Sequence, residues 1–270
     1  MTCILQISDL HFGTEVPAVA AALADLARQQ KPDVLVLSGD ITQRATASQF
    51  ADARAFCDRL AIGQLLAIPG NHDLPLHNPL ARLAFPYAAY KKAFGPVLEP
   101  QSESESLSIT GVNTTRWWRH KNGEVSRRQI DRVCQQLARA TAAQLRVVVV
   151  HQPVHVLRPQ DAHDRLRGWQ AAVTAWSAAG ADIVMGGHIH LPYVCELSEQ
   201  VVGLRRRLWC VQAGTAVSSR IRRGSPNSVN LVVFAPDAGG LQCRVERWDY
   251  SGITSEFERA EVHTLNVDRR

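Results

Sequence analysis

Five short segments of the chain combine aspartate, asparagine and histidine in a way that suits metal binding. They are Asp9-Leu10-His11, Gly39-Asp40, Gly70-Asn71-His72-Asp73, His151 and Gly187-His188-Ile189-His190. Carboxylate, amide and imidazole donors without a thiolate favour Mn²⁺, iron or Zn²⁺ over an iron–sulfur cluster. Mg²⁺ alone does not normally recruit so many imidazoles. The residue types therefore predict a site for such divalent ions.

The coincidence of the five segments carries more weight than any one of them. A single strand-end aspartate usually caps the next helix, and a single histidine is usually an ordinary polar side chain. Crowded carboxylates would repel one another, and burying them without cations would be costly, so two divalent ions are expected. Asp9 and His11 are two residues apart, which predicts that both side chains lie on one side of an extended strand. The same spacing separates His188 and His190.

Short apolar runs precede the five segments and are expected to be strands. The expected strands are 2–8, 33–38, 64–69, 106–112, 145–150 and 182–186, and the expected helices are 17–30, 46–61, 79–94, 126–140 and 166–179. Alternating strands and helices predict an α/β fold. Ligands of such sheets bind at the carboxyl ends of the strands, so the metal site is expected there.

The last third of the chain changes character. Runs 207–214, 228–236 and 241–250 look like strands joined by turns. They predict a second sheet, packed on the first as a layered sandwich. Residues 1–270 are expected to form a single domain, with the metal-site motifs in 1–195 and second-sheet strands in 196–270. Segment 100–108 is expected to be a polar turn, and segment 152–168 a lid over the site.

Composition sets the broad class of protein. The 270 residues are 46% hydrophobic and 20% charged, with a net charge of +5, which is too small to imply nucleic acid by itself. The six cysteines form no CxxC pair, which suggests reduced thiols in the cytoplasm. The first residues resemble no signal peptide, and no apolar run is long enough for a membrane span.

The ordered motifs DLH, GD, GNHD, a strand-end histidine and GHIH resemble those of the calcineurin-like metallophosphoesterase superfamily. The resemblance covers about residues 1–195, and the ISDLHFG opening is most similar to bacterial class III cyclic-nucleotide phosphodiesterases. It implies a four-layer α/β/β/α sandwich that holds two metal ions. One ion would be bound by Asp9, His11, Asp40 and His190, and the other by Asp40, Asn71, His151 and His188. Many relatives have His-His-Pro where this chain has His151-Gln152-Pro153.

The same resemblance implies a reaction. A hydroxide that bridges the metals would attack a phosphodiester in line with the leaving oxygen. His72 would protonate that oxygen, and Asp73 would orient the imidazole. Small phosphoesters, with 3′,5′-cyclic nucleotides as candidates, are the expected substrates. A phosphomonoesterase or a nuclease on the same metal core stays open, whereas a non-catalytic scaffold is disfavoured because all seven ligands and His72 are present.

Substrate contacts are harder to assign from sequence. Arg44 follows Asp40 closely and could bind a phosphate, and Asn113 and Arg116 follow an expected strand. Arg44 is the one extra cation near a motif, which favours a diester monoanion over a monoester dianion. The run 221–224, IRRG, is expected to be a solvated loop. A homodimer through the C-terminal strands is a candidate assembly.

Overall fold

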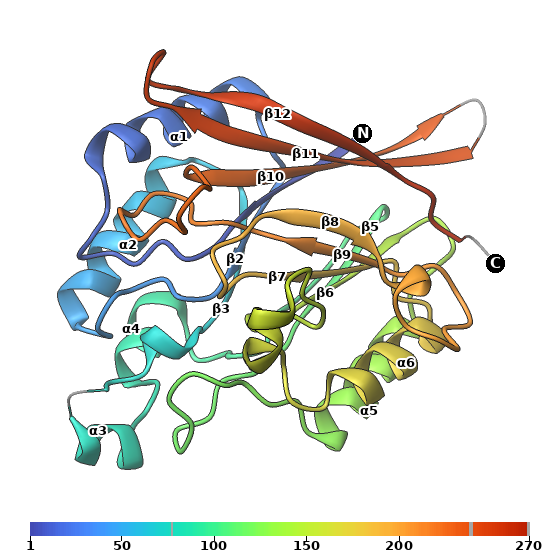
Figure 1. The fold of residues 1–270 in the computed structure, drawn as a ribbon, viewed down its shortest axis with the longest axis horizontal. Coiled ribbons are helices and arrows are strands. Elements are labelled where there is room, and N and C mark those ends of the chain that lie inside the picture. The colour runs from blue at the N-terminus through green and yellow to red at the C-terminus, as the bar shows by residue number, and fades with distance from the viewer. Residues whose placement is uncertain (77, 238–239, 269–270) are drawn as a thin grey trace.

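The computed structural model describes residues 1–76, 78–237 and 240–268 and contains two six-stranded sheets (Figure 1). The first sheet has the order β12-β11-β10-β1-β2-β3, formed by Glu256–Leu265, Gly240–Ser251, Ser228–Asp237, Thr2–Ile7, Val34–Ser38 and Gln64–Ile68. The second has the order β4-β5-β6-β7-β9-β8, formed by Gln101–Glu103, Leu107–Gly111, Leu145–Val149, Ile183–Gly186, Trp209–Gln212 and Tyr193–Glu196. All six strands expected before residue 190 are present.

The two sheets pack face to face, with helices on their outer sides. Buried side chains of both sheets, such as Val36 and Met185, share one apolar cluster between them. Helices α1 (Pro17–Gln30), α2 (Ala47–Arg59) and α4 (Ala88–Phe94) cover the first sheet through a second cluster that includes Leu23 and Phe50. Helices α5 (Arg127–Leu137) and α6 (Trp169–Ala179) cover the second sheet, and Trp176 is fully buried there. The expected α/β/β/α layering is confirmed (Figure 1).

Local sequence signals explain where these helices begin. Thr46 accepts a hydrogen bond from the Gln49 backbone nitrogen (3.3 Å) and caps α2. Ser126 caps α5 in a reciprocal arrangement, in which Gln129 Oε1 accepts from the Ser126 backbone nitrogen (3.0 Å). Pro17 opens α1, where its missing N–H costs nothing.

Three expectations about the fold are wrong. Residues 79–94 form two helices, α3 (Pro79–Ala84) and α4, because Pro86 lacks an N–H and keeps Phe85 out of the helical region. Segment 100–108 contains the short strand β4 rather than only a turn. The C-terminal strands do not make the second sheet alone, since β8 and β9 extend one sheet and β10–β12 extend the other.

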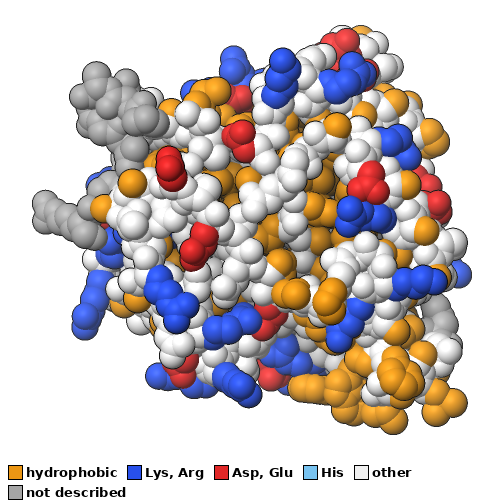
Figure 2. All heavy atoms as spheres, turned by 180° about the vertical axis from the view of Figure 1, so that it is seen from behind, with side chains coloured by type: hydrophobic (Ala, Val, Ile, Leu, Met, Phe, Trp, Pro, Cys, Tyr) orange, Lys and Arg blue, Asp and Glu red, His pale blue; other side chains and the backbone are white. Residues whose placement is uncertain are grey.

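The outer surface has one apolar corner. Figure 2 shows hydrophobic side chains gathered where α3 lies, and Leu80, Leu83 and Phe85 are exposed there. Helix α3 has no buried residue. Arg82 of α3 donates to the Trp117 carbonyl (2.7 Å), which ties this corner to the loop after β5. Among the described residues, no helix combines the length and the apolar character needed to cross a membrane.

Candidate functional site

Both sheets deliver polar side chains to one region of the fold, where Asp40, Asn71, His72, His188 and His190 line a cavity of about 400 Å³. Asp9 and His11 follow β1, Asp40 follows β2 and Asn71 follows β3. His151 follows β6, whereas His188 and His190 follow β7. The structure thus brings all seven sequence-predicted metal ligands together at the carboxyl ends of five strands, and six of the seven are buried.

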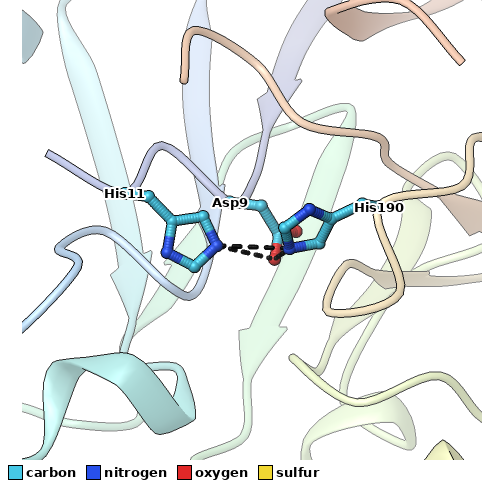
Figure 3. A group of neighbouring side chains, drawn as sticks. All are labelled: Asp9, His11 and His190. Atoms are coloured by element: carbon cyan, nitrogen blue, oxygen red, sulfur yellow. Dashed lines mark hydrogen bonds and ion pairs between the residues drawn. The ribbon is translucent and has the colours of Figure 1, made fainter. Parts of the chain in front are cut away.

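The first group of ligands consists of Asp9, His11 and His190 (Figure 3). Asp9 Oδ1 lies 3.2 Å from His190 Nε2 and 3.8 Å from His11 Nε2. The two imidazole Nε2 atoms are 3.2 Å apart. Figure 3 shows both rings turned toward the carboxylate that lies between them. Three donor atoms at this separation could bind one ion.

The second group consists of Asp40, His151 and His188, with Asn71 beside it. His151 Nε2 lies 3.2 Å from Asp40 Oδ1 and 3.2 Å from Asn71 Oδ1. The other oxygen of Asp40 lies 3.9 Å from His11 Nε2, in the first group. Asp40 therefore stands between the two groups, where a bridging carboxylate would have to be.

Backbone carbonyls orient two of the histidines. His151 Nδ1 is 2.8 Å from the Ser38 carbonyl oxygen, and His190 Nδ1 contacts the Arg220 carbonyl oxygen. A carbonyl can only accept, so each Nδ1 carries a proton and each Nε2 is the ring nitrogen that a metal ion could occupy. The His188 backbone nitrogen donates to Asp9 Oδ2 (2.9 Å), which joins the β7 end to the β1 end.

Five ligands have a left-handed backbone. The φ angles are 52° at Asp9, 44° at His11, 49° at Asp40, 76° at His188 and 56° at His190. Strand alternation was therefore the wrong reason to pair Asp9 with His11, because both lie beyond the end of β1 in sharp turns. Aspartate and histidine tolerate this conformation better than most residues, although it still costs free energy.

Two glycines let the turns come close together. A Cβ at Gly70 would collide with the Asp40 backbone nitrogen, and one at Gly187 would collide with Ser8 Oγ. Both positions therefore need glycine, which has no Cβ and allows the close backbone approach. They let the β3 end approach Asp40 and the β7 end approach Asp9.

Electrostatics in the cavity favour ionised carboxylates. Burial opposes ionisation of Asp40, but His151 and His72 outweigh it and hold the pKa of Asp40 well below its usual range. Burial would also lower the pKa of His151, yet Asp40 raises it to about 9. At His11 burial dominates and lowers the pKa to about 3. In the metal-free protein, protonated His151 thus supplies the positive charge beside Asp40 that a metal ion would otherwise supply.

Buried atoms without partners indicate that metal ions fit the site. His188 Nδ1 makes no hydrogen bond within the described residues. Asp9 Oδ1 is close to His190 but lacks normal hydrogen-bond geometry. Such an atom costs about 1–3 kcal/mol when it is left unsatisfied. A coordinated divalent ion would satisfy both atoms, and imidazole with carboxylate is a donor set that Mn²⁺, iron and Zn²⁺ accept.

His72 lies at the cavity beside the ligands. Its backbone nitrogen donates to Asp40 Oδ1 (2.8 Å), and its ring centroid is 4.8 Å from that of His11. Its Nδ1 is 3.1 Å from the Gln43 carbonyl oxygen. The ring is therefore held through Nδ1, and its Nε2 faces Arg220 Nη1 at 3.4 Å.

Asp73 does not orient the His72 ring, contrary to expectation. Its carboxylate accepts hydrogen bonds from the backbone nitrogens of Gly70 (2.8 Å), Ile41 (3.0 Å) and Thr42 (2.8 Å). Burial, together with the charge of Asp40, raises the pKa of Asp73 to about 6. The residue pins the β2 and β3 ends to each other, and the Gln43 carbonyl orients the ring instead.

Loop residues form the rim of the cavity, and among them Arg222 of the run 221–224 is half-buried rather than solvated as expected. Lys121 Nζ lies 2.7 Å from Asp164 Oδ1, which is also 3.7 Å from His188 Nε2. Arg222 Nη2 contacts both carboxylate oxygens of Asp161, at 2.9 and 3.0 Å. Both aspartates belong to a 3₁₀ turn, Pro159–Asp164, within the segment expected to be a lid. The expected lid over 152–168 was the one feature of the sequence that pointed to Asp161 and Asp164.

Gln152, which replaces the second histidine of the His-His-Pro found in many relatives, supports the loop that carries Lys121. Its Oε1 accepts from Thr114 Oγ1 (2.6 Å), and its Nε2 donates to the Lys121 carbonyl (3.2 Å). The side chain is fully buried. It therefore positions the loop that carries Lys121.

The three candidate substrate residues lie elsewhere. Asn113 and Arg116 line a separate hollow of about 440 Å³ with Glu99. Arg116 Nη2 donates to Gln129 Oε1 (2.7 Å). Arg44 is exposed and lines a third hollow with Pro75. The structure does not bring these residues together with the metal ligands.

Comparisons with known proteins point the same way as the geometry. Residues 3–192 match the family described as Calcineurin-like phosphoesterase. A curated relative, the "Probable cyclic nucleotide phosphodiesterase syc0937_d" of a Synechococcus strain, is 33% identical over 82 residues. That match covers 27% of this chain and 31% of the relative, so it spans under a third of the relative's length.

Two solved structures share the fold at low sequence identity. A dimetal phosphatase from Danio rerio superimposes with a TM-score of 0.70 at 12% identity, over 99% of both chains. The purple acid phosphatase PPD1 from yellow lupin gives a TM-score of 0.70 at 12% identity, over 97% of this chain and 53% of its own. At this identity the likeness concerns the fold.

Proposed function

Because the chain belongs to the calcineurin-like phosphoesterase family, we propose that it is a dimetal phosphodiesterase that acts on small diesters such as 3′,5′-cyclic nucleotides. The observation that carries the proposal is the convergence of the seven candidate ligands and His72 on one region of the fold, where His72 and four of the seven line the cavity. Two ions, Mn²⁺ or iron with Zn²⁺ as an alternative, would be held in two sets that share Asp40. The sets are Asp9, His11, Asp40 and His190, and Asp40, Asn71, His151 and His188.

The chain's own residues would bind, orient and protonate the substrate. When bound, the ions supply charge stabilisation and an activated water. His72 is held through Nδ1 by Gln43, so its protonated ring would donate from Nε2 to the leaving ester oxygen. The Lys121 loop and the Pro159–Asp164 turn border the cavity and would restrict the access of water.

The charges on the rim support a diester rather than a monoester. Lys121 is paired with Asp164, and Arg222 is paired with Asp161. These two cations are therefore largely compensated within the protein, and of the arginines and lysines in the described lining Arg220 remains beside neutral partners. A monoester is a dianion near neutral pH and needs more compensation than the monoanion of a diester.

Cyclic nucleotides are proposed as the substrate class on narrower support. The name of the Synechococcus relative mentions cyclic nucleotides, and the ISDLHFG opening is similar to that of class III phosphodiesterases.

A substrate panel in Mn²⁺ tests the proposal. We expect a bis-aryl phosphate to be cleaved with higher kcat/KM than the matching mono-aryl phosphate. A 3′,5′-cyclic nucleotide should be opened to a monophosphate that persists. Preference for the monoester would establish a phosphomonoesterase, and degradation of polynucleotides with no cleavage of small diesters would establish a nuclease. Two bound ions without any turnover would point to a scaffold.

Assembly and location are proposed as well. The edge strand β12 presents a long exposed edge that a second copy could extend into a homodimer. Sedimentation velocity would reveal the dimer, and a monomer at micromolar concentration would refute it. No disulfide joins any of the six cysteines within the described residues, which supports a reducing compartment such as the cytoplasm.

A further inference from the structure

Arg220 differs from the other cations that line the metal cavity. Lys121 and Arg222 each pair with a carboxylate, at distances of 2.7 Å and 2.9 Å. Arg220 Nη1 instead donates to Gln43 Oε1 (2.7 Å) and lies 3.4 Å from His72 Nε2. Neither partner carries a negative charge. The positive charge of Arg220 is thus presented to the cavity beside the proposed proton donor.

The backbone of Arg220 is fixed independently of its side chain. Its nitrogen donates to Ser218 Oγ (3.1 Å), and its carbonyl oxygen accepts from Thr215 Oγ1 (3.0 Å). The same carbonyl accepts from His190 Nδ1. Backbone hydrogen bonds therefore hold Arg220 at the rim, and a change of side chain leaves the contact of its carbonyl with His190 in place.

We infer that the Arg220 guanidinium binds a phosphoryl oxygen of the substrate and holds the ester oxygen near His72 Nε2. The inference rests on the proposed phosphoesterase function and specifies how the same site recognises its substrate. Arginine forms strong, often bidentate hydrogen bonds with phosphate. Partial burial in the cavity strengthens the attraction relative to open water.

The geometry favours Arg220 over Arg44 for this contact. Arg44 is exposed and lines a hollow with Asn78 and Phe85, outside the metal cavity. Arg220 lines the same cavity as Asp40 and His190. One uncompensated cation suits a substrate with a single negative charge. It would also help a dianion more than a monoanion, so its loss should affect the two ester classes unequally.

Two substitutions at Arg220 and one matched control test the inference in the Mn²⁺-loaded protein. Arg220→Gln removes the charge, and Arg220→Lys keeps it without the planar fork. Arg223→Gln removes an exposed charge from the same loop and is the control. Binding of inorganic phosphate is measured by calorimetry, and kcat/KM is measured for the bis-aryl and mono-aryl phosphates. Metal content and melting temperature are measured for every variant.

Arg220→Gln should weaken phosphate binding and lower kcat/KM by about 10- to 100-fold, as expected for a lost charged hydrogen bond. Arg220→Lys should recover part of this loss, and Arg223→Gln should change neither quantity by more than about twofold. The mono-aryl ester should lose more than the bis-aryl ester. Two ions per chain should be retained throughout.

Equal phosphate affinity and kcat/KM in Arg220→Gln and Arg223→Gln would overturn the inference. A loss of metal in Arg220→Gln would also overturn it, because the residue would then act through His190. If Arg44→Ala instead of Arg220→Gln weakens phosphate binding, the contact belongs to Arg44. A wild-type protein that binds phosphate but cleaves no ester would refute the proposed function, and the calorimetric comparison would still decide the role of Arg220.

Discussion

The cavity is built from strand ends on one side and surface loops on the other, and the two differ in what holds them. Asp9, His11 and His151 at the strand ends are fully buried and are fixed by backbone hydrogen bonds. The Lys121 side chain on the rim is half exposed and is held by one ion pair with Asp164. The contrast indicates that strand ends set the chemistry, while loops adjust which substrate reaches it.

The largest effect is expected at the strand ends, from Asp40→Asn. Asp40 stands between both ligand groups, so its loss should weaken both ion sites. Because each ion contributes several kcal/mol to the reaction, kcat/KM should fall by about 10⁴-fold or more. Elemental analysis should show fewer than two ions per chain. Asp52→Asn, on the exposed face of α2, is the control and should behave as wild type.

His72→Ala should separate chemistry from metal binding at the same strand ends. Turnover should fall by about 10²–10⁴-fold because general acid catalysis is lost, while metal content stays near two ions. The loss should be smaller for esters with good leaving groups, which need less protonation. Equal losses for good and poor leaving groups would show that His72 is not the acid.

A substitution on the rim, Asp164→Asn, should have a smaller effect than the substitutions at the strand ends. Asp164 Oδ1 faces His188 Nε2 at 3.7 Å, so its removal should loosen one ligand and weaken metal affinity by about 10- to 100-fold. Asp161→Asn breaks the link of the same turn to Arg222 and is the matched comparison. If both variants bind Mn²⁺ equally well in titrations, Asp164 merely anchors the turn.

The smallest effect concerns the stability of the metal-free protein. An unfolded histidine has a pKa near 6.5. The folded pKa of His151 is raised to about 9 by Asp40 against the effect of burial, so its stabilisation should be lost as pH rises from about 6.5 to 9. His11, whose pKa burial lowers to about 3, should have the opposite effect below pH 6.5, where protonation favours the unfolded chain.

Urea denaturation in chelator at several pH values would measure this dependence. The free energy of unfolding should be highest near pH 6.5. Excess Mn²⁺ should remove the alkaline decline, because the metal replaces the proton on His151. The same decline with and without Mn²⁺ would show that the strand-end histidines do not cause it.

The convergence of the candidate ligands at the strand ends could be predicted because each follows an apolar run within a few residues, which is a short-range pattern. The reason given for their pairing was nevertheless wrong, since the left-handed turns at His188 and His190 cannot be read from spacing. Arg220 could not be predicted, because it is one of 30 basic residues and reaches the cavity through a loop that folds back from β9.

The fold, like the site, could be predicted only where the sequence carries a short-range pattern. The central strands could be predicted from their continuous apolar runs. Strand β12 was missed because most of its residues are exposed and many are charged, as suits the edge of a sheet. Which sheet each strand joins depends on contacts between distant segments, so the division of the C-terminal strands between two sheets had no local signal.

The left-handed turns at five ligands bear on how long the chain survives in a cell. Strained backbone costs of order 1–3 kcal/mol at each such residue, and the metal-free protein must meet that cost from its own packing. Bound ions would offset it by mass action and keep the chain folded. A population of chains without metal would open more often and be degraded sooner. Metal supply would then govern the abundance of the protein as well as its rate.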